Sequence, residues 1–111
     1  MNYKIVKFIQ NNIDIDVYVD IEKKTVWLTL TQMMTLYGKS RTTVARRIKN
    51  LYESGEIKID TTCAKIEHMV GNQIYQTAIY NLDVIIEVGR CFKITEITSF
   101  FLTGLSKLST V

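Results

Sequence analysis

Two apolar stripes at helical spacing, separated by a glycine, constrain the fold of this chain more than any other feature. The first stripe recurs at i, i+3, i+4 and i+7, the spacing of one helical face, and consists of Leu30, Met33, Met34 and Tyr37. The second stripe consists of Val44, Ile48, Leu51 and Tyr52. Thr29 and Ser40 stand where N-caps belong, and Gly38 allows a positive φ or a close backbone crossing. The segment from about 29 to 54 therefore predicts two helices joined by a tight turn.

The second of these helices carries charge of one sign opposite its apolar stripe. The far face holds Thr42, Thr43, Arg46, Lys49 and Asn50, and it is flanked by Lys39, Arg41 and Arg47. Five cations and no acid lie between positions 39 and 49, whereas the remaining nine lysines and arginines face eleven acids. The net charge of +3 is therefore local to this helix.

A helix-turn-helix needs this arrangement, because cations, hydroxyls and a helix N-terminus bind phosphates while side chains of the first turns contact base edges. We expect Arg46, Lys49, Asn50, Thr42 and Thr43 to face the groove, and Lys39, Ser40, Arg41 and Arg47 to contact phosphates. Arginine is suited to guanine and asparagine to adenine. The alternative is an ordinary solvated helix, but such faces usually mix Glu with Lys at i, i+4.

The chain before these helices has the pattern of β structure. Lys4 to Ile9 is a short apolar run, and Gln10 to Asn12 is a turn cluster. Ile13 to Val19 alternates strictly between apolar and polar residues, as a half-buried strand does. Thr25 to Leu28 predicts a third short strand that leads into the first helix.

After the basic helix, Ser54 and Gly55 predict a C-terminal stop. A β segment should then run from Ile57 to Met69, interrupted near 60–62, and return after a tight turn in which Gly71 and Asn72 supply positive φ angles. A two-residue loop places His68 opposite Tyr75, Ile66 opposite Thr77, and Ala64 opposite Ile79. This hairpin, about 57–80, would be a wing. Its possible DNA contacts are Lys65, Asn72 and Gln73, but an architectural role is equally open because Glu67 leaves it little net charge.

The last part of the chain predicts two helices, within about 82–108. Asn81 is a cap for a short helix that ends at Gly89, and an apolar stripe then predicts a helix over roughly Thr95 to Leu108. This stripe could belong to the core or could meet a second copy. A homodimer through the C-terminal helix would suit a DNA-binding protein, because two half-sites raise affinity and specificity.

Composition and motifs exclude several classes of protein. The 111 residues, 47% apolar and 23% charged, predict one globular domain over 1–111. No apolar run reaches the roughly 18 residues of a membrane span, and no signal pattern starts the chain, so we expect cytoplasmic residence with Cys63 and Cys91 as free thiols. We expect no enzyme, cofactor, metal site or small-molecule ligand. The acids Asp14, Asp16 and Asp20 have no histidine nearby, and His68 has no acid or base partner.

The segment WLTLTQMMTLYGKSRTTVARRIKNLYESGEI followed by IYNLDVIIEVG resembles the N-terminal domain of the RhuM-type virulence-associated proteins, a bacterial, phage-related family. The likeness runs from about Lys4 to Gly89 and implies a DNA-binding domain. Ser40, Arg41, Ile48, Lys49 and Asn50 fall on the recognition-helix pattern of the family, and Arg47 takes the place of its histidine.

The chain also departs from that family. Met34 stands where the family often has alanine, and most of the basic patch that follows the position of Gly89 in relatives is missing from Arg90 to Ile97. Many relatives continue into a longer C-terminal region, so this chain could be a truncated copy or a domain of a longer protein.

Together these patterns predict an α+β fold, a winged helix-turn-helix with an N-terminal β-hairpin and a C-terminal helix. The expected function is sequence-specific binding of double-stranded DNA, as a transcriptional regulator of phage or mobile-element origin. The alternative is a protein-interaction adaptor that uses the same scaffold without specific DNA binding.

Overall fold

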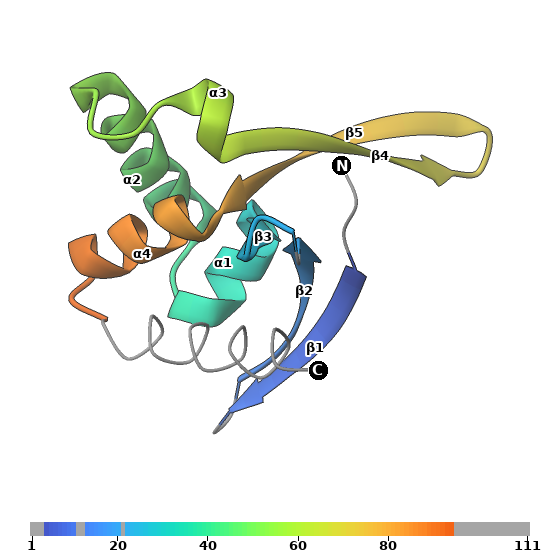
Figure 1. Ribbon diagram of the computed structural model, residues 1–111, viewed down its shortest axis with the longest axis horizontal. Coiled ribbons are helices and arrows are strands. Elements are labelled where there is room, and N and C mark those ends of the chain that lie inside the picture. Colours follow the sequence, from blue (N-terminus) through green and yellow to red (C-terminus); the bar gives the residue numbers. More distant parts are fainter. Residues whose placement is uncertain (1–3, 11–12, 21, 95–111) are drawn as a thin grey trace.

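The computed structural model describes residues 4–10, 13–20 and 22–94. Within these ranges the chain forms an α+β structure with a five-stranded antiparallel sheet and four helices (Figure 1). In chain order the elements are β1 (Lys4–Gln10), β2 (Ile13–Asp20), β3 (Thr25–Thr29), α1 (Leu30–Tyr37), α2 (Arg41–Ser54), α3 (Ile59–Thr62), β4 (Cys63–Val70), β5 (Gln73–Asn81) and α4 (Leu82–Cys91). None of the helices in these ranges is both long and apolar enough to cross a membrane.

The sheet has the strand order β1-β2-β3-β5-β4. The predicted alternation in β2 is confirmed, because Ile15, Val17 and Val19 are buried while Asp14 and Asp16 are exposed. The strands predicted at Lys4 to Ile9 and Thr25 to Leu28 are also confirmed, each extended by one residue. Asp20 is buried, and its carboxylate accepts a hydrogen bond from the Lys23 backbone at 3.1 Å, so it shapes the turn after β2.

The two helices predicted from the apolar stripes are confirmed together with their caps. The Thr29 side chain accepts from the Gln32 backbone, and the Gln32 side chain accepts from the Thr29 backbone, which makes a capping box at the start of α1. Gly38 takes φ 62° at the end of α1, and the Ser40 hydroxyl caps α2. The buried residues of the pair are Met33, Leu36, Tyr37, Val44, Ile48 and Leu51, so Leu36 joins the stripe that the spacing predicted.

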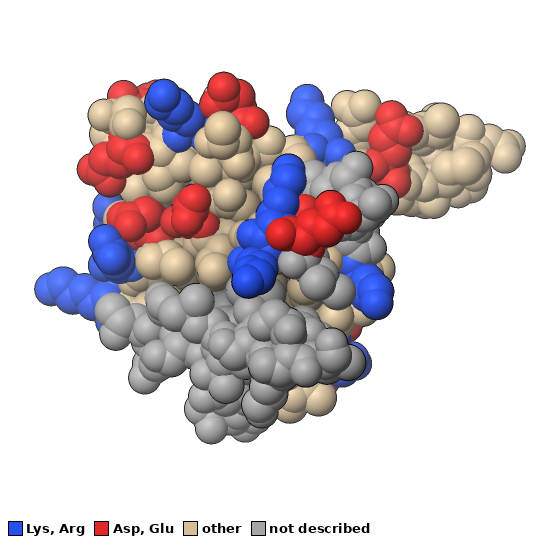
Figure 2. All heavy atoms as spheres, in the orientation of Figure 1, with Lys and Arg blue, Asp and Glu red and all other residues tan. Residues whose placement is uncertain are grey.

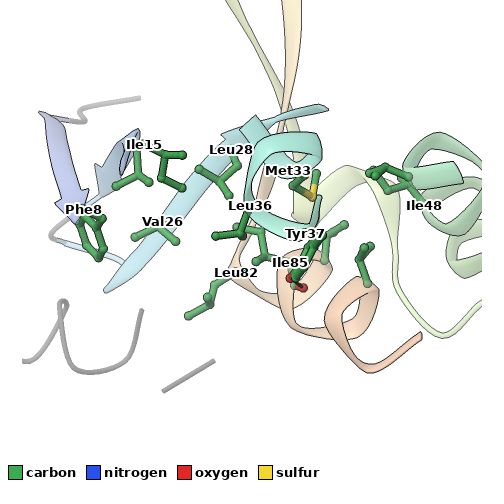
Figure 3. Packing of buried hydrophobic residues seen from close by; sticks show 14 of the residues in the cluster. Phe8, Ile15, Val26, Leu28, Met33, Leu36, Tyr37, Ile48, Leu82 and Ile85 are labelled. Atoms are coloured by element: carbon green, nitrogen blue, oxygen red, sulfur yellow. Dashed lines mark hydrogen bonds between the residues drawn. The ribbon is translucent and has the colours of Figure 1, made fainter. Parts of the chain in front are cut away.

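A single hydrophobic cluster connects the sheet with α1, α2 and α4 (Figure 3). Tyr37 lies at the junction of the helices. Its hydroxyl donates to the Ile85 carbonyl of α4, and its ring meets Phe92 edge-on at 5.6 Å between centroids. Burial raises the pKa of the Tyr37 phenol well above its ordinary value.

The hairpin register is confirmed at every predicted pair. His68 lies opposite Tyr75, Ile66 opposite Thr77, and Ala64 opposite Ile79. Only Gly71 of the two loop residues takes a positive φ, at 64°, so the prediction for Asn72 was wrong. A glycine with positive φ at the first loop position is what a type II′ turn requires.

The β segment predicted from Ile57 instead begins at Cys63, and the interruption predicted near 60–62 falls within the one-turn helix α3. The Thr62 hydroxyl is buried, donates to the Lys58 carbonyl at 2.6 Å, and lies 3.0 Å from the Tyr52 hydroxyl of α2. This hydrogen bond between α2 and α3 stabilises the turn at 59–62, and the pattern of neighbouring residues in the sequence does not predict it.

The predicted stop at Gly89 is also wrong, since α4 continues to Cys91. A Cβ at Gly89 would lie 2.8 Å from the Ile94 carbonyl oxygen and 3.0 Å from the Tyr37 hydroxyl. Glycine at this position therefore allows the Ile94 carbonyl and the Tyr37 hydroxyl to lie close to the backbone of α4. The helix predicted at Thr95 to Leu108 lies outside the described residues.

Gly89→Ala tests that close approach. Helix propensity alone would make the alanine variant about 0.8–1.0 kcal/mol more stable. We expect instead a loss of about 1–3 kcal/mol in the free energy of unfolding, because the added methyl overpacks the junction. Urea denaturation measures whether the free energy of unfolding falls or rises, and a more stable variant would contradict the described packing.

Tyr37→Phe tests the link between α1 and α4. At neutral pH we expect a loss of about 1–3 kcal/mol, since the buried Ile85 carbonyl loses its donor. Above about pH 10 the tyrosine of the unfolded chain ionises, whereas burial keeps the folded phenol neutral. The contribution of Tyr37 is thus complete below that pH and declines above it. Denaturation from pH 7 to 11 should show that the difference in free energy of unfolding between wild type and variant narrows at high pH. A difference that stays constant over this range would contradict the burial of the Tyr37 phenol.

Candidate nucleic-acid interface

The outer face of α2 is a cationic surface held in place by a buried apolar one. Val44, Ile48 and Leu51 are at most 6% exposed and fix the rotation of the helix about its axis. The side chains on the opposite side line a shallow, open depression formed by Arg41, Thr42, Ala45, Arg46 and Lys49. We call the exposed residues Arg41, Thr42, Arg46, Arg47, Lys49 and Asn50 the α2 outer face.

The N-terminus of α2 is capped by a side chain and remains exposed. The Ser40 hydroxyl accepts from the Thr43 backbone at 3.2 Å and lies 2.8 Å from the Thr43 hydroxyl. Thr43 is half-buried and its hydroxyl is engaged in the cap, so it is less available to a ligand than Thr42. The backbone N–H groups of a helix start are a general anion-binding feature.

The cations of this surface differ in their partners. Lys49 lies 3.8 Å from Glu53 in an exposed i, i+4 pair, which a competing phosphate can replace because such surface pairs are weak. Among the described residues, no carboxylate forms an ion pair with Arg41, Arg46 or Arg47. The guanidinium groups therefore face solvent.

Lys39 has a partner that sequence spacing did not indicate. Its ammonium lies 5.4 Å from the centroid of the Phe92 ring, a cation–π contact that holds the loop between α1 and α2 against the end of α4. Phe92 comes from a part of the sequence far from Lys39, so only the folded chain shows this contact.

Arg41 lies near the base of the β4–β5 hairpin. Burial is the main cause that raises the pKa of the Tyr80 phenol, Cys63 adds to the rise, and the positive charge of Arg41 opposes it. Burial also raises the pKa of the Cys63 thiol, while the positive charge of Lys65 opposes the rise, so the protonated thiol is favoured. Both cysteines are free, as the sequence predicted.

Two of the three predicted hairpin contacts, Asn72 and Gln73, lie at the tip, away from the α2 outer face. Lys65, Asn72 and Gln73 are all exposed, and Gln73 accepts a hydrogen bond from the Tyr75 hydroxyl at 2.6 Å. The hairpin tip and α2 stand at opposite ends of the longest axis of the view in Figure 1. Asn72 and Gln73 thus form no continuous patch with the α2 cations.

Acidic residues gather on another face, which sequence reasoning missed. An open groove of about 610 Å³ lies between the end of α2, α3 and α4. Its charged residues are Glu56, Lys58, Asp83, Glu87 and Arg90, with Arg90 paired to Glu87 at 3.1 Å. Figure 2 shows acidic side chains over this part of the molecule. This groove therefore carries three acids and two cations, whereas the residues of the α2 outer face include cations and no acid.

Within the described ranges, no group of three or more His, Cys, Asp or Glu residues is placed to hold a metal ion. His68 is exposed and stacks on Tyr75 across the hairpin, with ring centroids 6.0 Å apart. Comparison of the chain with protein-family models, curated proteins and solved structures gave no match.

Proposed function

We propose that this protein binds double-stranded DNA in a sequence-specific manner and acts as a transcriptional regulator, with α2 as its recognition helix. The observation that carries the proposal is the α2 outer face, whose arginines are solvent-facing and whose orientation is set by the buried side of the same helix. Arg46, Lys49, Asn50 and Thr42 would enter the major groove. Lys39, Ser40, Arg41 and Arg47 would contact phosphates.

The order of elements supports a winged helix-turn-helix as the architecture. A helix pair joined by a three-residue turn is followed by a hairpin and a further helix. In such a domain the second helix of the pair lies in the major groove. The resemblance to RhuM-type proteins supports the same assignment, and with it a phage or mobile-element origin and a bacterial cytoplasmic location.

A protein-interaction adaptor is the competing function, with the α2 outer face docked on an acidic protein. The two functions differ in what copurifies with the chain. DNA binding predicts nucleic acid that raises the 260/280 nm absorbance ratio and is removed by high salt, because phosphate contacts release counterions. An adaptor predicts no such nucleic acid.

Arg46→Ala combined with Lys49→Ala tests the proposed groove contacts. We expect affinity for duplex DNA to fall at least about tenfold. Two cations in the groove also reduce the charge of the nearby phosphates, and the slope of log K against log salt should flatten by about 0.9 for each phosphate that the variant no longer neutralises. Fluorescence anisotropy over a salt series measures both quantities.

The matched control is Lys23→Ala combined with Lys58→Ala, which removes the same charge from exposed positions off the α2 outer face. It should bind nearly as wild type does. If the Arg46/Lys49 variant keeps wild-type affinity and slope, or if the control is weakened as much, α2 is not the recognition helix.

Ser40 allows stability to be separated from binding. Ser40→Asp keeps a good N-cap and adds a negative charge that favours the helix start, so the melting temperature should stay equal or rise. DNA affinity should nevertheless fall by about tenfold, because the carboxylate occupies the expected phosphate position. Ser40→Asn keeps the cap without charge and should bind within about threefold of wild type. Equal affinity of the Asp and Asn variants would show that no phosphate lies at this helix start.

A further inference from the structure

The β4–β5 hairpin projects from the body as an apolar arm. β5 pairs with β3 only through Ile79–Asn81, so the outer part of the hairpin is a two-stranded ribbon (Figure 1). Its exposed apolar side chains are Met69 (67% exposed), Val70 (60%), Ile74 (65%) and Tyr75 (45%). No charged side chain lies between His68 and Tyr75, and the end of the arm is uncharged in Figure 2.

Such an arm leaves apolar side chains and strand-edge backbone groups exposed to water. A two-stranded hairpin is marginally stable by itself, and contiguous exposed apolar residues mark contact surfaces. The arm has too few cations to follow a phosphate backbone, because Lys65 is offset by Glu67. A protein surface is the better match.

The free edge of β4 determines what can pair with it. In a two-residue hairpin the closing pair, Val70 and Gln73, is hydrogen-bonded, and such pairs alternate along the ladder. The intervening residues, Cys63, Lys65, Glu67 and Met69, therefore direct their backbone N–H and C=O groups away from β5. Because β4 ends the sheet of the described residues, these groups form a template for another strand.

We propose that the template pairs with β4 of a second copy of this chain, antiparallel, about a twofold axis at Ile66. Backbone hydrogen bonding permits only alignments that match outward-directed residues with each other. An axis at Lys65 or at Glu67 would place two like charges directly opposite, which destabilises a sheet. An axis at Ile66 places Lys65 of each copy opposite Glu67 of the other, so the dimer contains two such pairs.

The same register also gives apolar residues of β4 a partner. Ile66 meets Ile66 of the second copy on one face, and Met69 lies opposite Cys63 of the second copy on the other. The outer end of each arm runs toward α3 of the other copy, where Ile59 is 60% exposed. The pairing therefore covers the exposed Met69 and brings the two half-buried Ile66 side chains together.

The other edge of the sheet does not offer this complementarity. The charged residues of β1 are Lys4 and Lys7, both exposed and of the same sign, so self-pairing of β1 offers no pair of opposite charges within the strand. Lysine on an edge strand is a common protection against such pairing. β4 instead carries one charge of each sign at the spacing that a twofold axis requires.

This inference goes beyond the proposed DNA binding, and its test uses no DNA, so either proposal can fail while the other stands. It also uses a different surface from a dimer through Thr95–Leu108, which lies outside the described residues.

Disulfide trapping tests the register. In a Cys63→Ser, Cys91→Ser background, Ile66→Cys should form a linked dimer of twice the 12.8 kDa chain mass under mild oxidation. The two Cα atoms would be about 4.5 Å apart in a non-hydrogen-bonded pair, within the reach of a disulfide. The control is His68→Cys, on the same face of the arm, whose copies would be about 13 Å apart. We expect linking at least about tenfold faster for Ile66→Cys; equal rates, or no linked dimer, would overturn the proposal.

A charge exchange tests the contact without new cysteines. Lys65→Glu and Glu67→Lys should each raise the dimer dissociation constant by about tenfold, because each places like charges opposite at two sites. The variant with both substitutions should return to within about threefold of wild type. Sedimentation equilibrium measures the constants, and circular dichroism confirms that each variant is folded. A wild-type chain that stays monomeric at about 0.1 mM, or a double variant as weak as the singles, would refute the twofold pairing at Ile66.

Discussion

Burial of the inner side of α2 is the constraint on which the candidate interface depends. Val44, Ile48 and Leu51 join a core built by the sheet, α1 and α4, and so leave the helix a single rotation about its axis. Because Arg46 and Lys49 lie opposite that stripe, burying it turns them to solvent, with Arg41 and Arg47 exposed at the flanks. The hydrophobic effect therefore positions a charged surface through the apolar side of the same helix.

Three surfaces with different chemistry result from this arrangement. The α2 outer face is cationic, the groove beside α3 and α4 is mainly acidic, and the outer end of the hairpin is apolar and uncharged. These surfaces differ in their attraction for phosphate. The α2 outer face has an excess of positive charge, the groove has three acids against two cations, and the hairpin end has no charge. We infer that DNA contact and self-association use separate parts of the fold, so one protein can do both at once.

Local chemistry made much of the fold predictable. The caps at Thr29 and Ser40 and the register around Gly71 depend on neighbouring residues, and all were confirmed. The helix at 59–62, where only a break in the strand was predicted, and the error at Gly89 both depend on contacts between distant segments. These contacts are the Thr62 hydroxyl with Tyr52, and Tyr37 and Ile94 beside the missing Cβ of Gly89. For the same reason the sequence indicated which cations line α2 but not the contact of Lys39 with Phe92 or the projection of the arm.

The most direct test of the central claim is selection of binding sites from random-sequence duplex DNA, carried out at low and at physiological salt with the complete chain. We predict that one short motif is enriched at both salt concentrations and that total binding falls as salt rises, because phosphate contacts supply affinity while base contacts supply specificity. Absence of any enriched motif at both salt concentrations would contradict a sequence-specific role for the α2 outer face.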